Sequence, residues 1–297
     1  MVLAPSGSND VFYTGRLTIN DAGLEISSGA ALNGNNYAGN INLLQFSGTN
    51  ASLMGPGTID GRGDIISGTA RLVQAAHSNL YVEGGNGFNA RGVSIHTPAT
   101  RKNSDGIDID SLTNASVINS DIEAGDDGIA IRANSGNVAN VTIANTRLHG
   151  THGLSVGGID KNTVSNILFQ NNYVYGNDLN GTLSTDANGI NVKTEPCALT
   201  VSQVSYLNTC MFEVKHLIVL DTNYHTCTAG GRRSLSYRVV NGAYAPQSLP
   251  GAYAKIDGRN SSAPVNAWLA NVSLNATAQS GDRYAYARTG GADITRW

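Results

Sequence analysis

The chain has 297 residues, of which 40% are hydrophobic and 14% charged, and its formal net charge is −3. This composition excludes an intrinsically disordered chain and argues against nucleic-acid binding, which leaves a basic footprint. No stretch reaches the roughly 18 consecutive apolar residues that a membrane span requires, so we expect neither a nucleic-acid nor a membrane partner.

The first part of the chain consists of short β-type runs separated by glycine, asparagine and serine. These runs lie at 15–19, 23–26 and 41–46. Turn residues at such short intervals are typical of strands joined by turns, and no stretch has a convincing 3.6-residue apolar period. The 35 glycines and only 3 methionines point the same way, so we predict an all-β protein.

A pattern made of a polar residue, a glycine and alternating apolar residues recurs in the middle of the chain. Its copies lie at 105–109, 127–131, 152–156 and 188–192, with a weaker one at 216–219. Repeats of this length are typical of solenoids, in which each unit buries its apolar face against its neighbours. A second family of apolar runs lies between the copies, so each turn offers at least two strands. We predict a single-stranded right-handed parallel β-helix, whose hand follows the general crossover preference.

The end of the chain is less regular, and the whole is expected to form one domain over residues 1–297. Beyond about residue 230 the repeat fades, and Arg232, Arg233, Pro246 and Pro250 indicate a covering segment over 230–297. The long stretch 173–188 is expected to project as a loop beside the repeats. Asparagines near strand edges predict turns and hydrogen-bonded ladders along the stack.

The three cysteines give little guidance. Cys197, Cys210 and Cys227 allow three different single pairs and always leave one thiol over. None has the paired spacing of a zinc site.

The polar residue before the repeated glycine varies: Asp105, Asp127, His152 and Asn188. Stacking places equivalent residues on neighbouring turns about 4.8 Å apart, so Asp105 and Asp127 are expected to lie together, with Asp126 adjacent and His152 one turn further. Like charges raise the pKa of one carboxyl group and keep a proton on it, which is the arrangement that general acid–base hydrolysis uses. Asp-Gly is also a common turn dipeptide, but two such pairs and a His-Gly in one column favour a functional site.

Alternation along the first copy raises a difficulty. If Ile107 and Ile109 point into the core, Asp105 points inward too. A bend or bulge at Asp105–Gly106 must therefore redirect the carboxyl group, and the glycine permits it.

The ordered motifs resemble those of glycoside hydrolase family 28, the polygalacturonases, and are nearest to the bacterial-type members. They are Asn-Ser-Asp-Gly-Ile-Asp at 103–108, Gly-Asp-Asp at 125–127, His-Gly-x-Ser-x-Gly at 152–157 and Lys-Thr at 193–194, with supporting matches at 59–63 and 97–100. The resemblance runs from about residue 15 to 225. It implies a right-handed parallel β-helix and inverting hydrolysis of α-1,4-galacturonosidic linkages in pectin. No metal or other cofactor is implied.

Roles follow from the resemblance at matching positions. Asp126 matches the general acid, Asp105 and Asp127 match the pair that holds the attacking water, and His152 matches the histidine that supports the acid. In substrate binding, Lys193 matches the lysine that grips a carboxylate. Tyr224 resembles the tyrosine that closes the cleavage subsite. The partner is then a pectic polysaccharide, and the protein is expected to act as a secreted, extracellular monomer.

One departure from the family pattern concerns substrate binding. Asn191 stands where the family has arginine, which removes a bidentate clamp for a carboxylate. Arg132, two copies earlier, is expected to supply some positive charge to substrate binding instead. From the resemblance, we also expect this sequence to lack the family's N-terminal helix and capping coil.

Three hypotheses remain open. The first is a hydrolase of the polygalacturonase type. The second is a related β-helix hydrolase with shifted specificity, for rhamnogalacturonan or substituted galacturonan, as the change at Asn191 suggests. The third is a non-catalytic polysaccharide-binding β-helix, which the complete set of Asp105, Asp126, Asp127 and His152 argues against.

Overall fold

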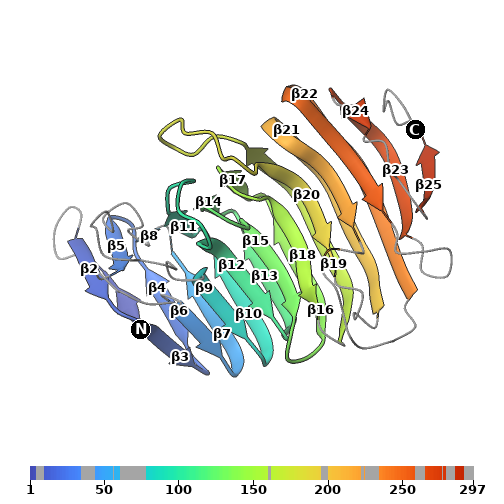
Figure 1. The fold of residues 1–297 in the computed structure, drawn as a ribbon. Helices are drawn as coiled ribbons and strands as arrows, with labels where there is room; N and C mark the ends of the chain where they lie inside the picture. Colours follow the sequence, from blue (N-terminus) through green and yellow to red (C-terminus); the bar gives the residue numbers. More distant parts are fainter. Residues whose placement is uncertain are drawn as a thin grey trace.

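Strands make up the regular secondary structure in the described part of this computed structural model. The structure describes residues 1–4, 10–34, 44–55, 57–60, 78–159, 162–194, 200–221, 224, 234–257, 265–275, 277–278 and 285–290. Figure 1 shows the strands side by side along one axis, from the N-terminal strands in blue to the C-terminal strands in red. The prediction of an all-β fold is confirmed. No described segment forms a helix long and apolar enough to cross a membrane.

The strands form three faces that run along the stack. From β1 to β16, each strand pairs in parallel with the strand three places further along the chain. Face 1 contains β1 (Val2–Leu3), β4 (Gly23–Ile26), β7 (Thr49–Met54), β10 (Asn86–Arg91), β13 (Thr113–Ile118) and β16 (Val138–Ala144). Face 2 contains β2 (Asp10–Thr14), β5 (Ala30–Gly34), β8 (Thr58–Asp60), β11 (Ser94–His96), β14 (Asp121–Glu123) and β17 (Arg147–His149). Face 3 contains β3 (Leu17–Asn20), β6 (Leu44–Ser47), β9 (Ser78–Glu83), β12 (Asp105–Asp110), β15 (Ile129–Ala133), β18 (Leu154–Ile159) and β20 (Asn188–Lys193).

The later strands are long enough to bend from one face to the next. The strand β19 (Thr163–Tyr175) pairs first with β16 and then with β17, and β21 (Thr200–Asp221) pairs with β19 and then with β20. The stack continues through β22 (Ser234–Asp257), β23 (Val265–Leu274), β24 (Thr277–Ala278) and β25 (Ala285–Gly290). The architecture is the predicted right-handed parallel β-helix, with three strands in a turn.

Apolar side chains stack inside this helix because the register keeps equivalent residues aligned. One inward column on face 3 is fully buried and consists of Leu44, Leu80, Ile107, Ile129, Leu154, Ile190 and Ile218. Burying one such side chain is worth about 1.5–3 kcal/mol. The column therefore fixes the register of the strands that carry the polar residues of the repeat.

The predicted asparagine ladder lies at the edge of face 1. Asn114, Asn140 and Asn166 all have positive φ angles, between 54° and 59°, a conformation that asparagine tolerates better than most residues. Each donates from Nδ2 to the Oδ1 atom of the asparagine one turn earlier, over 2.9 Å from Asn140 to Asn114 and 2.8 Å from Asn166 to Asn140. The ladder satisfies side-chain polar groups along the stack.

Two other sequence expectations meet the structure here. Residues 176–187 connect β19 to β20 and contain one isolated antiparallel bridge, between Asn177 and Leu183. Where a less regular segment was expected over 230–297, the described strands β22 and β23 add two further rungs of parallel ladder, because alternate residues there remain buried. Arg232, Arg233, Cys197, Cys227 and the supporting match at 61–63 lie outside the described residues.

Candidate active site

The repeated glycines explain how the polar column is built on face 3. A Cβ atom on Gly106 would collide with the carbonyl oxygen of Gly128 one turn on, and a Cβ atom on Gly153 would collide with that of Gly189. On Gly189 it would lie 2.7 Å from the carbonyl oxygen of Leu217. Glycine is therefore required at this step because adjacent turns approach so closely there.

The chain changes sides at the first of these glycines. Ile107 and Ile109 are fully buried in the core, and strict alternation would direct Asp105 the same way. The carboxyl groups of Asp105 and Asp108 instead bind the same guanidinium group, that of Arg132. Asp105 therefore lies on the outer side of face 3, as the sequence analysis requires.

Asp126 and His152 form a hydrogen-bonded pair that faces solvent. The Nδ1 atom of His152 lies 3.0 Å from Oδ1 of Asp126, and the side chains are 20% and 23% exposed. Burial by itself raises the pKa of Asp126, but the hydrogen bond from His152 and its charge lower it below the usual range. Burial lowers the pKa of His152, and Asp126 more than reverses this, so that the pKa is raised. Both shifts favour a proton on the histidine over one on the carboxylate.

Asp127 is buried and binds three side chains. Ser155 donates from Oγ to Oδ1 over 2.6 Å, and Lys193 Nζ lies 3.0 Å from each carboxylate oxygen. Arg132 Nη2 is 3.8 Å from Oδ2. Burial lowers the pKa of Lys193, but Asp127 outweighs this and raises it, so this lysine is charged. Its ammonium group also lies 5.6 Å from the ring centroid of Tyr224.

Asp105 is also buried, with 5% of its surface exposed. Burial raises the pKa of Asp105 well above its usual value, the charges of Asp108, Asp127 and Asp126 add to the increase, and Arg132 opposes it. Arg132 is not among the residues that line the cavity described below. Arg132 is predicted from the sequence to take part in substrate binding, whereas in the structure its guanidinium group lies within reach of three carboxylates.

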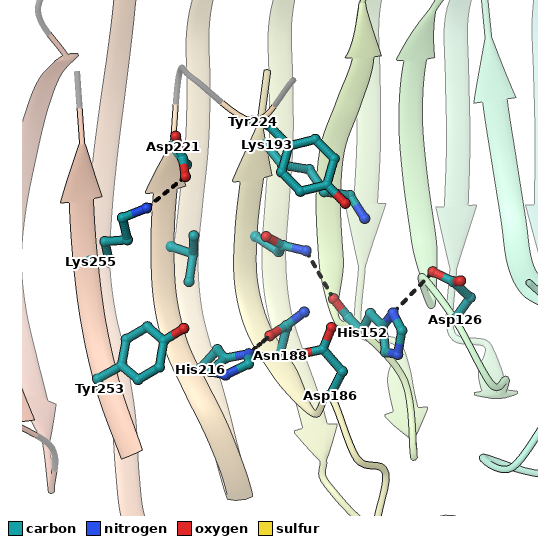
Figure 2. Close-up of a pocket in the computed structure, with 12 residues that line it drawn as sticks. Asp126, His152, Asp186, Asn188, Lys193, His216, Asp221, Tyr224, Tyr253 and Lys255 are labelled. Carbon is teal, nitrogen blue, oxygen red and sulfur yellow. Dashed lines mark hydrogen bonds and ion pairs between the residues drawn. The ribbon is translucent and has the colours of Figure 1, made fainter. Parts of the chain in front are cut away.

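A cavity of about 340 Å³ lies against Asp126 and His152 and continues across later turns. Figure 2 shows Asp126 and His152 at one end of this site and Tyr253 and Lys255 at the other. The lining residues are Asp126, His152, Asp186, Asn188, Asn191, Lys193, His216, Val219, Asp221, Tyr224, Tyr253 and Lys255. The cavity is thus a cleft along the stack, lined by side chains from successive turns.

Seven lining residues were not among the predicted site residues: Asp186, Asn188, His216, Val219, Asp221, Tyr253 and Lys255. His216 belongs to the weak fifth copy of the repeat and pairs in register with Asn188 and with Tyr253. Its Nδ1 atom lies 2.9 Å from Oδ1 of Asp186, which comes from the loop before β20. The fifth copy was the only available signal for this part of the cleft.

One triad also has the spacing of metal ligands. An oxygen of Asp126, an oxygen of Asp127 and a ring nitrogen of His152 lie within 4.8 Å of one another. Lys193 and Arg132 already bring positive charge to Asp127. The expectation that the protein works without a metal stays a prediction.

Comparisons with known proteins are consistent with this site. The family model described as glycosyl hydrolases family 28 matches residues 66–281. An endo-polygalacturonase of Pectobacterium carotovorum subsp. carotovorum is 28% identical over 283 residues, covering 74% of this chain and 67% of the relative. A polygalacturonase of Ralstonia nicotianae is 36% identical over 131 residues, covering 44% of this chain but only 24% of the relative.

Solved structures share the fold. A polygalacturonase from Erwinia carotovora ssp. carotovora superposes with a TM-score of 0.70 at 23% identity, covering 94% of this chain and 88% of that one. An endo-xylogalacturonan hydrolase from Aspergillus tubingensis gives a TM-score of 0.60 at 15% identity, covering 98% of this chain and 91% of the other. Both comparisons confirm the β-helical architecture.

Proposed function

The chain belongs to glycosyl hydrolases family 28, and from this premise we propose that it hydrolyses α-1,4-galacturonosidic linkages of pectin by general acid–base catalysis. One observation carries the proposal: the Asp126–His152 pair, 3.0 Å apart, lines the cleft close to buried Asp127, which Arg132 connects to buried Asp105. A proton donor and a pair of water-binding carboxylates are the groups that hydrolysis of a glycosidic bond needs.

In the proposed reaction Asp126 donates a proton to the leaving glycosidic oxygen. The free protein stores this proton on His152. A polyanionic substrate in the cleft adds negative charge, which raises the pKa of both groups. A substrate charge that lies nearer to Asp126 than to His152 favours transfer of the proton from Nδ1 to the carboxylate. After bond cleavage, His152 takes up a proton from solvent and restores the pair, while the base releases to solvent the proton that it took from the attacking water.

Water is activated by Asp105 and Asp127 in this proposal. Asp127 is a poor candidate for a covalent nucleophile, because it is 1% exposed and Lys193 contacts both of its oxygens. The short distance between Asp126 and Asp127 differs from the spacing of about 6.5–9.5 Å that is common in inverting enzymes. Because Lys193 contacts both oxygens of the Asp127 carboxylate, direct attack by water is nevertheless favoured over a covalent intermediate, and hence inversion.

This assignment makes a stereochemical prediction. Because inversion converts an α-linkage into a β-configured product, the β-anomer of the new reducing end is expected to appear before mutarotation equilibrates it. Proton NMR during the first minutes of hydrolysis of polygalacturonate checks this. Early accumulation of the α-anomer would instead require a covalent intermediate and would overturn the assignment of Asp105 and Asp127.

Substrate binding is proposed to involve Lys193, Tyr224 and Asn191, which line the cleft. Asn191 donates from Nδ2 to Ser155 Oγ over 3.3 Å and to the His152 carbonyl over 3.4 Å, so its amide hydrogens support the catalytic turn. This use of Asn191, together with Asp186 and Asp221 in the cleft wall, favours the second candidate function: a related hydrolase that acts on rhamnogalacturonan or substituted galacturonan, where fewer carboxylates must be bound.

A substrate comparison tests both candidates. Reducing-sugar release is measured on demethylated polygalacturonate, on methyl-esterified pectin and on rhamnogalacturonan. The polygalacturonase proposal expects the highest kcat/KM on demethylated polygalacturonate, and the alternative expects it on one of the other two. If folded protein binds these polymers without releasing sugar from any of them, it is a non-catalytic polysaccharide-binding β-helix. We also propose that the protein acts outside the cell as a monomer, because its substrate is a cell-wall polymer.

A further inference from the structure

Three buried carboxyl groups converge on one guanidinium group, that of Arg132. Arg132 on β15 donates from Nη2 to Asp105 and, over 2.5 Å, from Nε to Asp108, both on β12. Its Nη2 atom lies 3.8 Å from Asp127. Asp105, Asp108 and Asp127 are 5%, 2% and 1% exposed. Arg132 thus joins the two proposed water-binding acids to a third carboxylate that the proposed mechanism does not use.

Four carboxyl groups, those of Asp105, Asp108, Asp126 and Asp127, lie around the cations Arg132 and Lys193, so loss of Arg132 removes one of these two positive charges. Ser78 on β9 donates to Asp108, and Ser155 on β18 donates to Asp127. The other charged groups nearby are Asp126, which adds negative charge, and Lys193, which contacts Asp127. Lys193 therefore neutralises Asp127, and the charge of Arg132 serves Asp105 and Asp108.

We propose that Arg132 is a positioning residue of the hydrolytic reaction, which favours the ionised form of the Asp105 carboxylate, aims it at the attacking water and does not bind the substrate. The proposal rests on the proposed function. It follows from the planar fork of the guanidinium group, which fixes two acceptors at once, and from the three carboxylates that lie within reach of that group.

The direction of the effect follows from the surroundings of Asp105. Burial and the charge of Asp108 raise the pKa of Asp105, whereas Arg132 lowers it. Asp105 must be ionised to accept a proton from water while the oxygen of that water bonds to the anomeric carbon and the leaving oxygen takes the proton of Asp126. Loss of Arg132 therefore raises the pKa of Asp105, so that the carboxylate takes up a proton, and the base is lost, at a higher pH than in the unmodified protein.

Arg132→Gln tests the proposal on polygalacturonate. We expect kcat to fall about 10²-fold, as when one charge-stabilising donor is removed from an active site, and KM to change less than about threefold. The acidic limb of the kcat profile is expected to move to higher pH. Arg132→Lys keeps the charge but loses the fork, so its kcat falls while its acidic limb stays near that of the unmodified protein. Arg91→Gln, which removes an exposed guanidinium group on face 1, is the matched control and leaves both unchanged.

A second variant keeps the test decisive if Arg132→Gln does not fold. Asp108→Asn removes a charge that raises the pKa of Asp105, so its acidic limb is expected to move to lower pH, opposite to that of Arg132→Gln. A rise in KM with kcat intact would assign Arg132 to substrate binding, and unchanged kcat, KM and pH limbs would leave it a purely structural ion pair. Either result overturns the inference alone, whereas inactivity of the unmodified chain on every pectic polymer overturns the proposed function.

Discussion

Replacing Asp126 with Asn is expected to lower kcat on the preferred pectic substrate by about 10²–10⁴-fold, with little change in KM or in stability. The amide keeps the shape of the side chain but has no acidic proton for the leaving oxygen. It also removes the negative charge that raises the pKa of His152. Initial rates of reducing-sugar release give kcat, and circular dichroism confirms that the variant is folded.

The matched control is Asp121→Asn. Asp121 also pairs with a histidine, since its Oδ1 atom lies 2.9 Å from Nε2 of His149, but it lies on face 2 and not among the residues of the cleft. Its substitution is expected to leave kcat within about twofold, because surface ion pairs have small effects. An Asp126→Asn variant that keeps a tenth or more of the activity would show that another group donates the proton.

Replacing Gly153 with Ala is expected to lower the free energy of unfolding by about 3 kcal/mol or more, because two penalties combine. The φ angle of Gly153 is +88°, which disfavours any side chain, and a Cβ atom there would collide with the carbonyl oxygens of Asn188 and Gly189 on the next turn. Relief of the collision separates β18 from β20 and displaces neighbouring His152. Urea denaturation followed by circular dichroism measures the loss.

Gly84→Ala separates the two penalties. The φ angle of Gly84 is +68°, but a Cβ atom there would have no neighbour within 4 Å. The loss is therefore expected to be about 1 kcal/mol, the penalty for a left-handed conformation alone. Equal losses at Gly153 and Gly84 would mean that the packing between turns is loose enough to absorb a methyl group, and that the glycine column has no steric role.

The sequence predicted the alignment of the repeated polar residues well because the repeat and the register have the same origin. Ile107, Ile129 and Leu154 must align to fill the core, and this alignment places Asp105, Asp127 and His152 on successive turns. Face 2 was harder to foresee. Its middle strands β11, β14 and β17 have three residues each, too few to show an alternating pattern.

The partners of individual side chains were beyond sequence reasoning. Arg132 is a charged residue near a predicted substrate site, which suggested a contact with substrate, but its guanidinium group has three buried carboxylates within reach. Asp186 reaches the cleft only because the loop before β20 returns it to His216. Such contacts depend on side-chain directions and on loop paths, which carry no repeating signal.

The cleft runs along the stack, and each successive turn adds one rung of side chains, from Asp126 through His152, Asn191 and Val219 to Lys255. The length of polymer that the protein can grip is therefore set by the number of turns beyond the catalytic one. Duplication or loss of a single turn in a gene would lengthen or shorten that grip by about 4.8 Å and leave the catalytic rung unchanged. The solenoid thus lets evolution adjust chain-length preference separately from the chemistry.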